Sequence, residues 1–169
     1  MKHFSNALFE GLIEPDNLDV SKLCKYVSKR INTFGGNCGS FALALFNKLT
    51  TLGYKVDIIL CSDLHNFEEE NWTDSDKLDW YLNCEPNIYH VAIRINGDNN
   101  SLYDGDGATS IDGLVDFCYT YYGDLNASIE SWSIDNKQDY ELFYKIFRFN
   151  TNMSIHPNEF DDVIASYFL

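Results

Sequence analysis

The sequence predicts one α+β domain in which a helix that begins at a cysteine packs on an antiparallel β-sheet. Three observations lead to this expectation. Two helical patterns come first, over residues 17–31 and 38–52. A strand pattern and a hairpin pattern follow over 54–62 and 88–107, and helical patterns then return. The chain has 169 residues, of which 45% are hydrophobic, so it can bury one core.

The first helix is predicted over residues 17–31 because apolar residues recur along one face and Asn17 or Asp19 can cap its start. The second, residues 38–52, is apolar on more of its surface, so we expect it to be more deeply buried. Gly53 stands where a glycine commonly ends a helix. Residues 54–62, YKVDIILCS, alternate and then become apolar throughout, which predicts an inner strand.

Residues 63–87 form an acidic segment that contains Trp72 and Trp80. Two interpretations stay open for it. It is either a solvated acidic helix anchored by the two tryptophans, or a segment that controls access of substrate and favours cationic substrates.

The stretches IYHVAIRI, NGDNN and SLYDGDG predict a hairpin whose turn lies near residues 96–100. In such a hairpin the numbers of paired residues add up to about 194–198, which places Asp104 close to His90. Three more helices are predicted over residues 111–122, 135–147 and 157–168.

Composition excludes several classes of protein. The net charge is −14 and the chain has 12 Lys and Arg residues, which argues against binding nucleic acid through phosphates. No apolar run approaches the roughly 20 residues needed to span a bilayer, and the first residues lack the apolar core of a signal peptide. We therefore expect a cytoplasmic protein without membrane contact. The 5 cysteines form no CxxC pair, so we expect no disulfide framework, no metal site and no cofactor.

Cys38 follows two glycines and starts the second predicted helix. Free backbone N–H groups and the helix dipole stabilise an anion there, which lowers the pKa of a thiol and raises its thiolate fraction. Gly35, Gly36 and Gly39 would let a substrate approach the backbone closely. Taken alone, a cysteine at this position is also compatible with a small buried core residue.

His90 and Asp104 supply the other parts of a catalytic set. If Val91 and Ile93 face one side of their strand, His90 faces the other, toward a cleft. A carboxylate at Asp104 could orient the imidazole and stabilise its cation. The alternatives are a strand histidine that is only structural, and a turn or calcium loop at DGDG. The oxyanion hole would use the backbone N–H of Cys38 and the side-chain amide of Asn32 or Asn37, with Asn32 favoured.

Three stretches resemble the papain-like and transglutaminase-like cysteine superfamily, which includes papain-type peptidases, transglutaminases, arylamine N-acetyltransferases and small bacterial and phage proteins. They are GGNCGSFALALFNKLTTLGYKV, HVAIRI and SLYDGDG, within residues 30–110 and in the family order Cys, His, Asp. The resemblance implies Cys38 as nucleophile, His90 as base and Asp104 as the orienting residue. It also implies a nucleophile-bearing helix on an antiparallel sheet with extra helices around that core.

The sequence therefore predicts a cysteine-dependent acyl-transfer enzyme: an amide or thioester hydrolase, peptidase, deamidase or transamidase. Its substrate would be a peptide, protein, amide or thioester. The alternative is a non-catalytic acidic protein on the same scaffold that binds or inhibits a partner, for example a phage-encoded protein acting on a host protein. We expect a single domain over 1–169, with a core at 17–122 and a helical C-terminal extension at 123–169.

Overall fold

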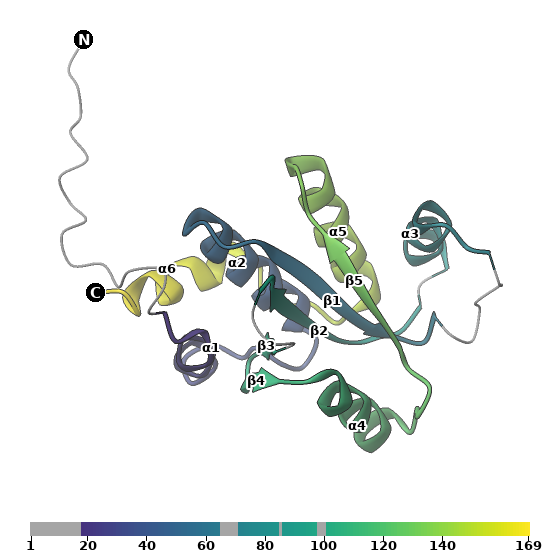
Figure 1. Cartoon of the computed structure of the whole chain (residues 1–169), viewed down its shortest axis with the longest axis horizontal. Coiled ribbons are helices and arrows are strands. Elements are labelled where there is room, and N and C mark those ends of the chain that lie inside the picture. The colour runs from purple at the N-terminus through teal and green to yellow at the C-terminus, as the bar shows by residue number, and fades with distance from the viewer. Residues whose placement is uncertain (1–17, 65–70, 85, 98–100) are drawn as a thin grey trace, which may run out of the picture.

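The computed structural model describes residues 18–64, 71–84, 86–97 and 101–169. The described chain is α+β, as the sequence predicts, and its helices surround one antiparallel sheet (Figure 1). In chain order the elements are α1 (Val20–Ser28), α2 (Cys38–Thr51), β1 (Val56–Ser62), α3 (Asp74–Asn83), β2 (Ile88–Ile95), β3 (Leu102–Asp104), β4 (Gly107–Thr109), α4 (Ile111–Tyr122), β5 (Ser128–Ser133), α5 (Lys137–Asn150) and α6 (Asn158–Ser166).

The sheet has the strand order β4-β3-β2-β1-β5. β1 is buried along its whole length and pairs with β2 on one side and β5 on the other. The predicted hairpin is present in β2 and β3, with Ile93 opposite Tyr103 and Arg94 opposite Leu102, which is the register that the sequence predicts. Part of its turn, residues 98–100, lies outside the described residues.

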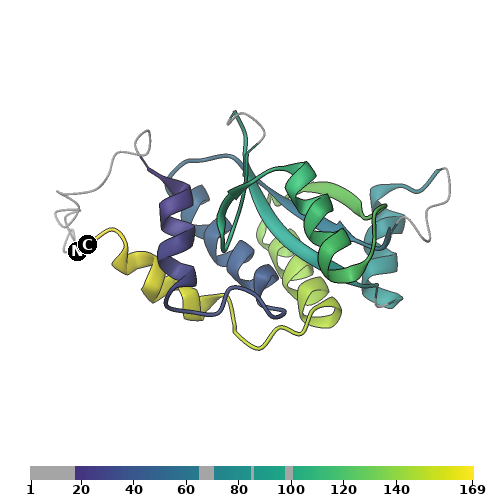
Figure 2. The same cartoon turned by 90° about the horizontal axis from the view of Figure 1, so that it is seen from below.

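The helix that starts at Cys38 is the central helix of the fold. α2 is apolar over most of its surface and packs on the sheet, on α5 and on α6, and these three helices lie on the same side of the sheet (Figure 2). Ile58 and Leu60 join that large core, whereas Ile59 belongs to a smaller apolar cluster with Ala92 and with Leu114 of α4. Because successive strand residues point to opposite faces, α4 packs on the other face of the sheet.

The C-terminal part differs from the predicted helical extension because residues 128–133 form a strand. β5 completes one edge of the sheet beside β1. Its sequence, SIESWS, gives little alternating pattern, since Ile129 and Trp132 are three residues apart and only Trp132 is buried. Two helices follow, α5 and α6, close to where the sequence predicts them.

The acidic segment contains α3, whose start is fixed by a capping box between Thr73 and Asp76. Trp80 is buried and its ring lies 6.2 Å from that of Trp72. The anchored helix of the first interpretation is therefore present. Residues 65–70 and 85 lie outside the described residues, and control of substrate access by this segment stays a prediction.

No helix in the described part of the chain is long and apolar enough to cross a membrane.

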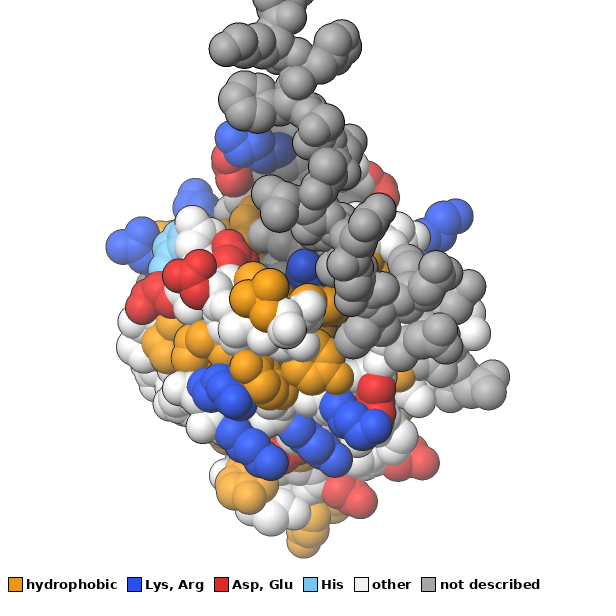
Figure 3. Space-filling view, turned by 90° about the vertical axis from the view of Figure 1, so that its left-hand side faces the viewer, with side chains coloured by type: hydrophobic (Ala, Val, Ile, Leu, Met, Phe, Trp, Pro, Cys, Tyr) orange, Lys and Arg blue, Asp and Glu red, His pale blue; other side chains and the backbone are white. Residues whose placement is uncertain are grey.

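Basic side chains gather on one end of this acidic protein. Figure 3 faces the end that carries α1 and α6 and shows Lys and Arg side chains below an apolar patch. α1 and the residues that follow it contain Lys22, Lys25, Lys29 and Arg30.

Candidate active site

Cys38 is the first residue of α2, and the N-terminus of this helix is not capped by a side chain. Asn37 occupies the N-cap position but makes no side-chain hydrogen bond to the first turn. Side chains do cap α1, α3, α4 and α5, through Asp19, Thr73, Ser110 and Asn136. The first backbone N–H groups of α2 are thus left without a side-chain cap, next to the Cys38 sulfur, where they can stabilise negative charge.

The side chain of Asn37 binds the C-terminal segment instead. Its Oδ1 accepts hydrogen bonds from the backbone N–H groups of Ser154 and Ile155, both at 3.0 Å, and its Nδ2 donates to the carbonyl of Phe34 at 3.2 Å. Asn37 is 1% exposed. This buried amide fixes the loop before Cys38 to a segment more than a hundred residues away in sequence.

Two of the glycines around Cys38 permit close internal packing. A Cβ at Gly36 would lie 2.6 Å from the backbone of Asn152, and one at Gly39 would lie 2.7 Å from the ring of Phe147. Gly36 also has a φ of 92°, which favours glycine. The sequence prediction that Gly39 admits a substrate is therefore corrected, because it admits α5. Gly36 packs on the segment after α5 and also lines the cleft described below, as does Gly35.

His90 lies in β2 with its ring buried beside Asp104 at the end of β3. His90 Nε2 is 3.0 Å from Asp104 Oδ2. The Cys38 thiol lies near enough to the imidazole to raise its pKa, and both residues line the same cleft. The structure thus brings the three sequence-predicted residues together in the order thiol, imidazole, carboxylate.

Asp104 is held by the turn that follows it. Its second oxygen, Oδ1, accepts a hydrogen bond from the backbone N–H of Asp106 at 2.8 Å. Gly105 packs directly on Thr33, where any side chain would overlap the threonine. The DGDG stretch is therefore a tight turn between β3 and β4, one of the two structural alternatives considered for it.

The surroundings of His90 stabilise its protonated form. Burial lowers the pKa of the ring, but the hydrogen bond to Asp104 and the interactions with the Cys38 thiol and the Asp104 carboxylate outweigh burial and raise it to about 10. Two aromatic rings fix the imidazole plane: Phe34 is stacked at 5.9 Å between centroids, and Phe117 of α4 lies at 4.9 Å. A cationic imidazole next to a thiol is the arrangement that favours a thiolate.

Cys38 and His90 open onto a cleft of about 730 Å³. The other lining residues come from five segments: Phe34, Gly35, Gly36, Pro86, Asn87, Ile88, Tyr89, Asp106, Phe117, Tyr121, Tyr122, Phe149, Asn150, Thr151 and Asn152. All five cysteines lie within the described residues and are free thiols, and Cys38 alone among them lines the cleft. Burial raises the pKa of the Cys24 thiol, which makes it inert by comparison.

The two amides predicted for the oxyanion hole differ in availability. Both hydrogen-bonding ends of Asn37 are engaged, as described above. Asn32 is exposed, and its Oδ1 accepts the backbone N–H of Phe34 at 3.0 Å. A Cβ at Gly35 would lie 3.3 Å from Asn32 Nδ2, so this amide stands beside a residue of the cleft wall. Of the two, the geometry favours Asn32.

The sequence did not predict most of the residues that line the cleft. Phe34 and Phe117 hold the histidine, and Phe149 and Asn152 come from the C-terminal segment. One signal was visible: FCYTYY, residues 117–122, carries more aromatic residues than one buried helix face needs. Cys61 was also missed, although it stands opposite His90 on β1 and contacts the thiol of Cys118.

No group of His, Cys, Asp or Glu side chains in the described part of the chain is arranged to hold a metal ion. Among the remaining histidines, His156 packs against Tyr144, and its Nδ1 accepts the backbone N–H of Asn158. His3 and His65 lie outside the described residues.

No family model, curated protein or solved structure matched this chain. The site is therefore interpreted from its own geometry.

Proposed function

We propose that the protein is a cysteine-dependent acyl-transfer enzyme acting on an amide or thioester carbonyl. The observation that carries this proposal is a buried imidazole that is paired with Asp104 and lines one cleft together with Cys38, close enough for the thiol to raise its pKa. A thiol at a helix N-terminus without a side-chain cap, a histidine and a carboxylate are the parts that covalent catalysis by cysteine requires.

The reaction begins when the Cys38 sulfur attacks the carbonyl carbon and its π electrons move to oxygen. The backbone N–H of Cys38 and Nδ2 of Asn32 are the donors we assign to this oxyanion. When the tetrahedral intermediate collapses, the bond to the leaving amine or thiol breaks and protonated His90 gives that group its proton. Water or a second amine then attacks the acyl-enzyme, neutral His90 takes up the proton of the attacking group, and Cys38 is released.

The same arrangement supports a papain-like or transglutaminase-like core. The cysteine heads a helix packed on an antiparallel sheet, and the histidine and the carboxylate lie on neighbouring strands in the order Cys, His, Asp. Peptidase, deamidase and transamidase activities share this machinery. A cytoplasmic site of action is part of this proposal, since a reduced thiol is needed.

The test is the rate of iodoacetamide labelling at each cysteine from pH 5 to pH 9, read by mass spectrometry. Cys84 is exposed and serves as the internal reference, whereas Cys38 is 7% exposed. We expect Cys38 to label faster than Cys84 at pH 6, below the ordinary thiol pKa of about 8.5, and His90→Ala to abolish that advantage. A more buried thiol that reacts faster must be activated.

If Cys38 labels no faster than Cys84 at any pH, the nucleophile assignment is wrong. The acidic binding protein predicted as the alternative would then become the better hypothesis. Its supporting feature is the net charge of −14, which suits a cationic partner.

A further inference from the structure

The walls of the cleft have an uneven distribution of charge. Within the described residues the lining contains no Lys or Arg, and the one cation on it is the ring of His90. Asp106 is exposed at the rim. Lys25 packs on Gly107, next to Asp106, but does not line the cleft. An anionic substrate side chain would therefore meet no partner on the cleft wall other than the catalytic histidine.

Two more carboxylates stand directly behind lining residues. Tyr89 donates its hydroxyl proton to Asp124 Oδ2 at 2.9 Å, and Asn87 Nδ2 donates to Asp63 Oδ2 at 2.9 Å. Asp63 is buried, and its other oxygen, Oδ1, has no hydrogen-bond partner. The negative potential of these groups extends toward the cleft through the polar side chains that they hold.

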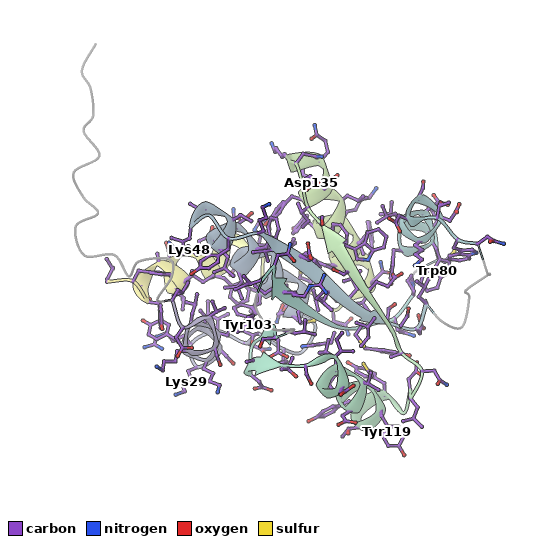
Figure 4. The ribbon with its side chains drawn as sticks, in the orientation of Figure 1. Lys29, Lys48, Trp80, Tyr103, Tyr119 and Asp135 are labelled. Carbon is purple, nitrogen blue, oxygen red and sulfur yellow. The ribbon has the colours of Figure 1, made fainter. Side chains whose placement is uncertain are left out.

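The face of the cleft formed by α4 and β2 is aromatic. Tyr89 and Tyr122 are stacked at 4.6 Å between ring centroids, and Phe117 and Tyr121 lie 4.7 Å apart. Tyr121 is 71% exposed, so its ring borders the cleft without serving the core. Tyr119 of the same helix does not line the cleft and lies on the outer side of α4 (Figure 4). Ring faces next to carboxylates are the surroundings in which organic cations bind.

We propose that the cleft selects a peptide acyl donor that carries a cationic side chain, Lys or Arg, next to the reacting carbonyl, and this inference rests on the proposed function. The ammonium or guanidinium group lies over the rings of Tyr121 and Tyr122, on the side of the cleft that faces the carboxylates described above. A peptide fits better than a small free amine, because the exposed ring of Phe149 also lines the cleft and can contact a neighbouring residue of an extended chain.

The test uses three peptidyl vinyl sulfones that differ only in the side chain beside the electrophile: Lys, norleucine or Glu. In this reaction the Cys38 sulfur adds to the alkene carbon β to the sulfone, which lies next to the variable residue, and the carbon bonded to the sulfone takes up a proton. Labelling rates at Cys38 and at Cys84 are read by mass spectrometry at pH 7 in 150 mM salt. The negative charge of the whole protein attracts cationic probes to every cysteine, and labelling at Cys84 measures this general effect. Salt at this concentration largely screens it.

At Cys38 we expect the Lys probe to react about tenfold faster than the norleucine probe, and the Glu probe to be the slowest. At Cys84 the three rates should be similar. Tyr121→Leu keeps an apolar side chain but removes the ring face, so the Lys advantage should fall at least about threefold. Asp106→Asn should also reduce it, whereas Asp162→Asn, the same charge change on α6 away from the cleft, should leave the ratio unchanged.

Equal rates for the Lys and norleucine probes at Cys38 would overturn the inference. So would a Lys preference of the same size at Cys84, or one that Tyr121→Leu and Asp106→Asn leave intact. Iodoacetamide separates this failure from failure of the proposed function: if Cys38 still labels at pH 6, the nucleophile stands and only the assigned specificity is wrong. If iodoacetamide labelling also shows no activation, both proposals fall.

Discussion

At the scale of single residues, the decisive feature is a histidine that stays protonated although it is buried. The side chain of His90 is 3% exposed, where burial alone would favour the neutral ring. Asp104 and Cys38 reverse that preference and raise the pKa to about 10. In the proposed reaction, His90 would therefore act first as an acid that protonates a leaving group over the whole neutral range of pH.

Asp104→Asn tests this account because it keeps the shape of the side chain and removes its charge. The pKa of His90 should fall, since the cation loses one of its two stabilising partners, and labelling of Cys38 at pH 6 should slow by about tenfold or more. In the parent protein the ring should lose its proton only near pH 10, so the rate of acyl transfer should hold up to that pH and decline above it. In Asp104→Asn, the rate of acyl transfer should begin to decline at a lower pH.

The measurement is an NMR titration of the histidine rings between pH 5 and 11 in the parent, in Asp104→Asn and in Asp162→Asn. Asp162 is an exposed residue of α6, so its variant controls for the loss of one negative charge. An unchanged titration of His90 in Asp104→Asn would show that the carboxylate does not set the charge of the ring.

At the scale of elements, the N-terminus of α2 depends on a contact with the other end of the chain. Asn37→Ala removes the acceptor of two backbone N–H groups, those of Ser154 and Ile155. Leaving buried donors unpaired costs about 1–3 kcal/mol, so the free energy of unfolding should fall by that amount. Labelling of Cys38 at pH 6 should also slow, because the loop before the nucleophile loses its support.

Urea unfolding and iodoacetamide labelling of the same samples check both effects. Asn158→Ala is the matched control, since Asn158 is exposed at the start of α6. This substitution should change the free energy of unfolding by no more than about 0.5 kcal/mol. Stability and labelling that match the control would mean that the 154–155 segment is held in place by other contacts.

The elements that carry Cys38, His90 and Asp104 could be predicted because local sequence patterns determine them. Alternation in IYHVAIRI sets which residues share a face with His90, and the hairpin turn sets the register that brings Asp104 near it. The cleft walls could not be predicted in this way. Phe149 and Asn152 line the same cleft as Cys38 because α5 packs on α2, and no local sequence pattern predicts that packing. Asn37 is similar, because its partners lie in a distant segment.

At the scale of the whole molecule, residues 123–169 are built into the same core as the catalytic residues. β5 pairs with β1, α5 and α6 pack on α2, and Phe147 lies against Gly39 of the nucleophile helix. The chain should therefore unfold as one cooperative unit, and the C-terminal part should not behave as a separable extension.

Two phenylalanines of α5 test this integration with a matched pair of variants. Phe147 is fully buried, so Phe147→Ala should lower the free energy of unfolding by about 3–5 kcal/mol. Phe149 is 56% exposed, and Phe149→Ala should cost less than about 1 kcal/mol. Tryptophan fluorescence and far-UV circular dichroism should report one coincident urea transition in both variants, and Cys38 should lose its labelling advantage over Cys84 at pH 6 only within that transition. If Phe147→Ala instead unfolds in two steps, with the α5 region melting first while the sheet persists, residues 123–169 form a separate cooperative unit and the cleft is assembled between two independently stable parts.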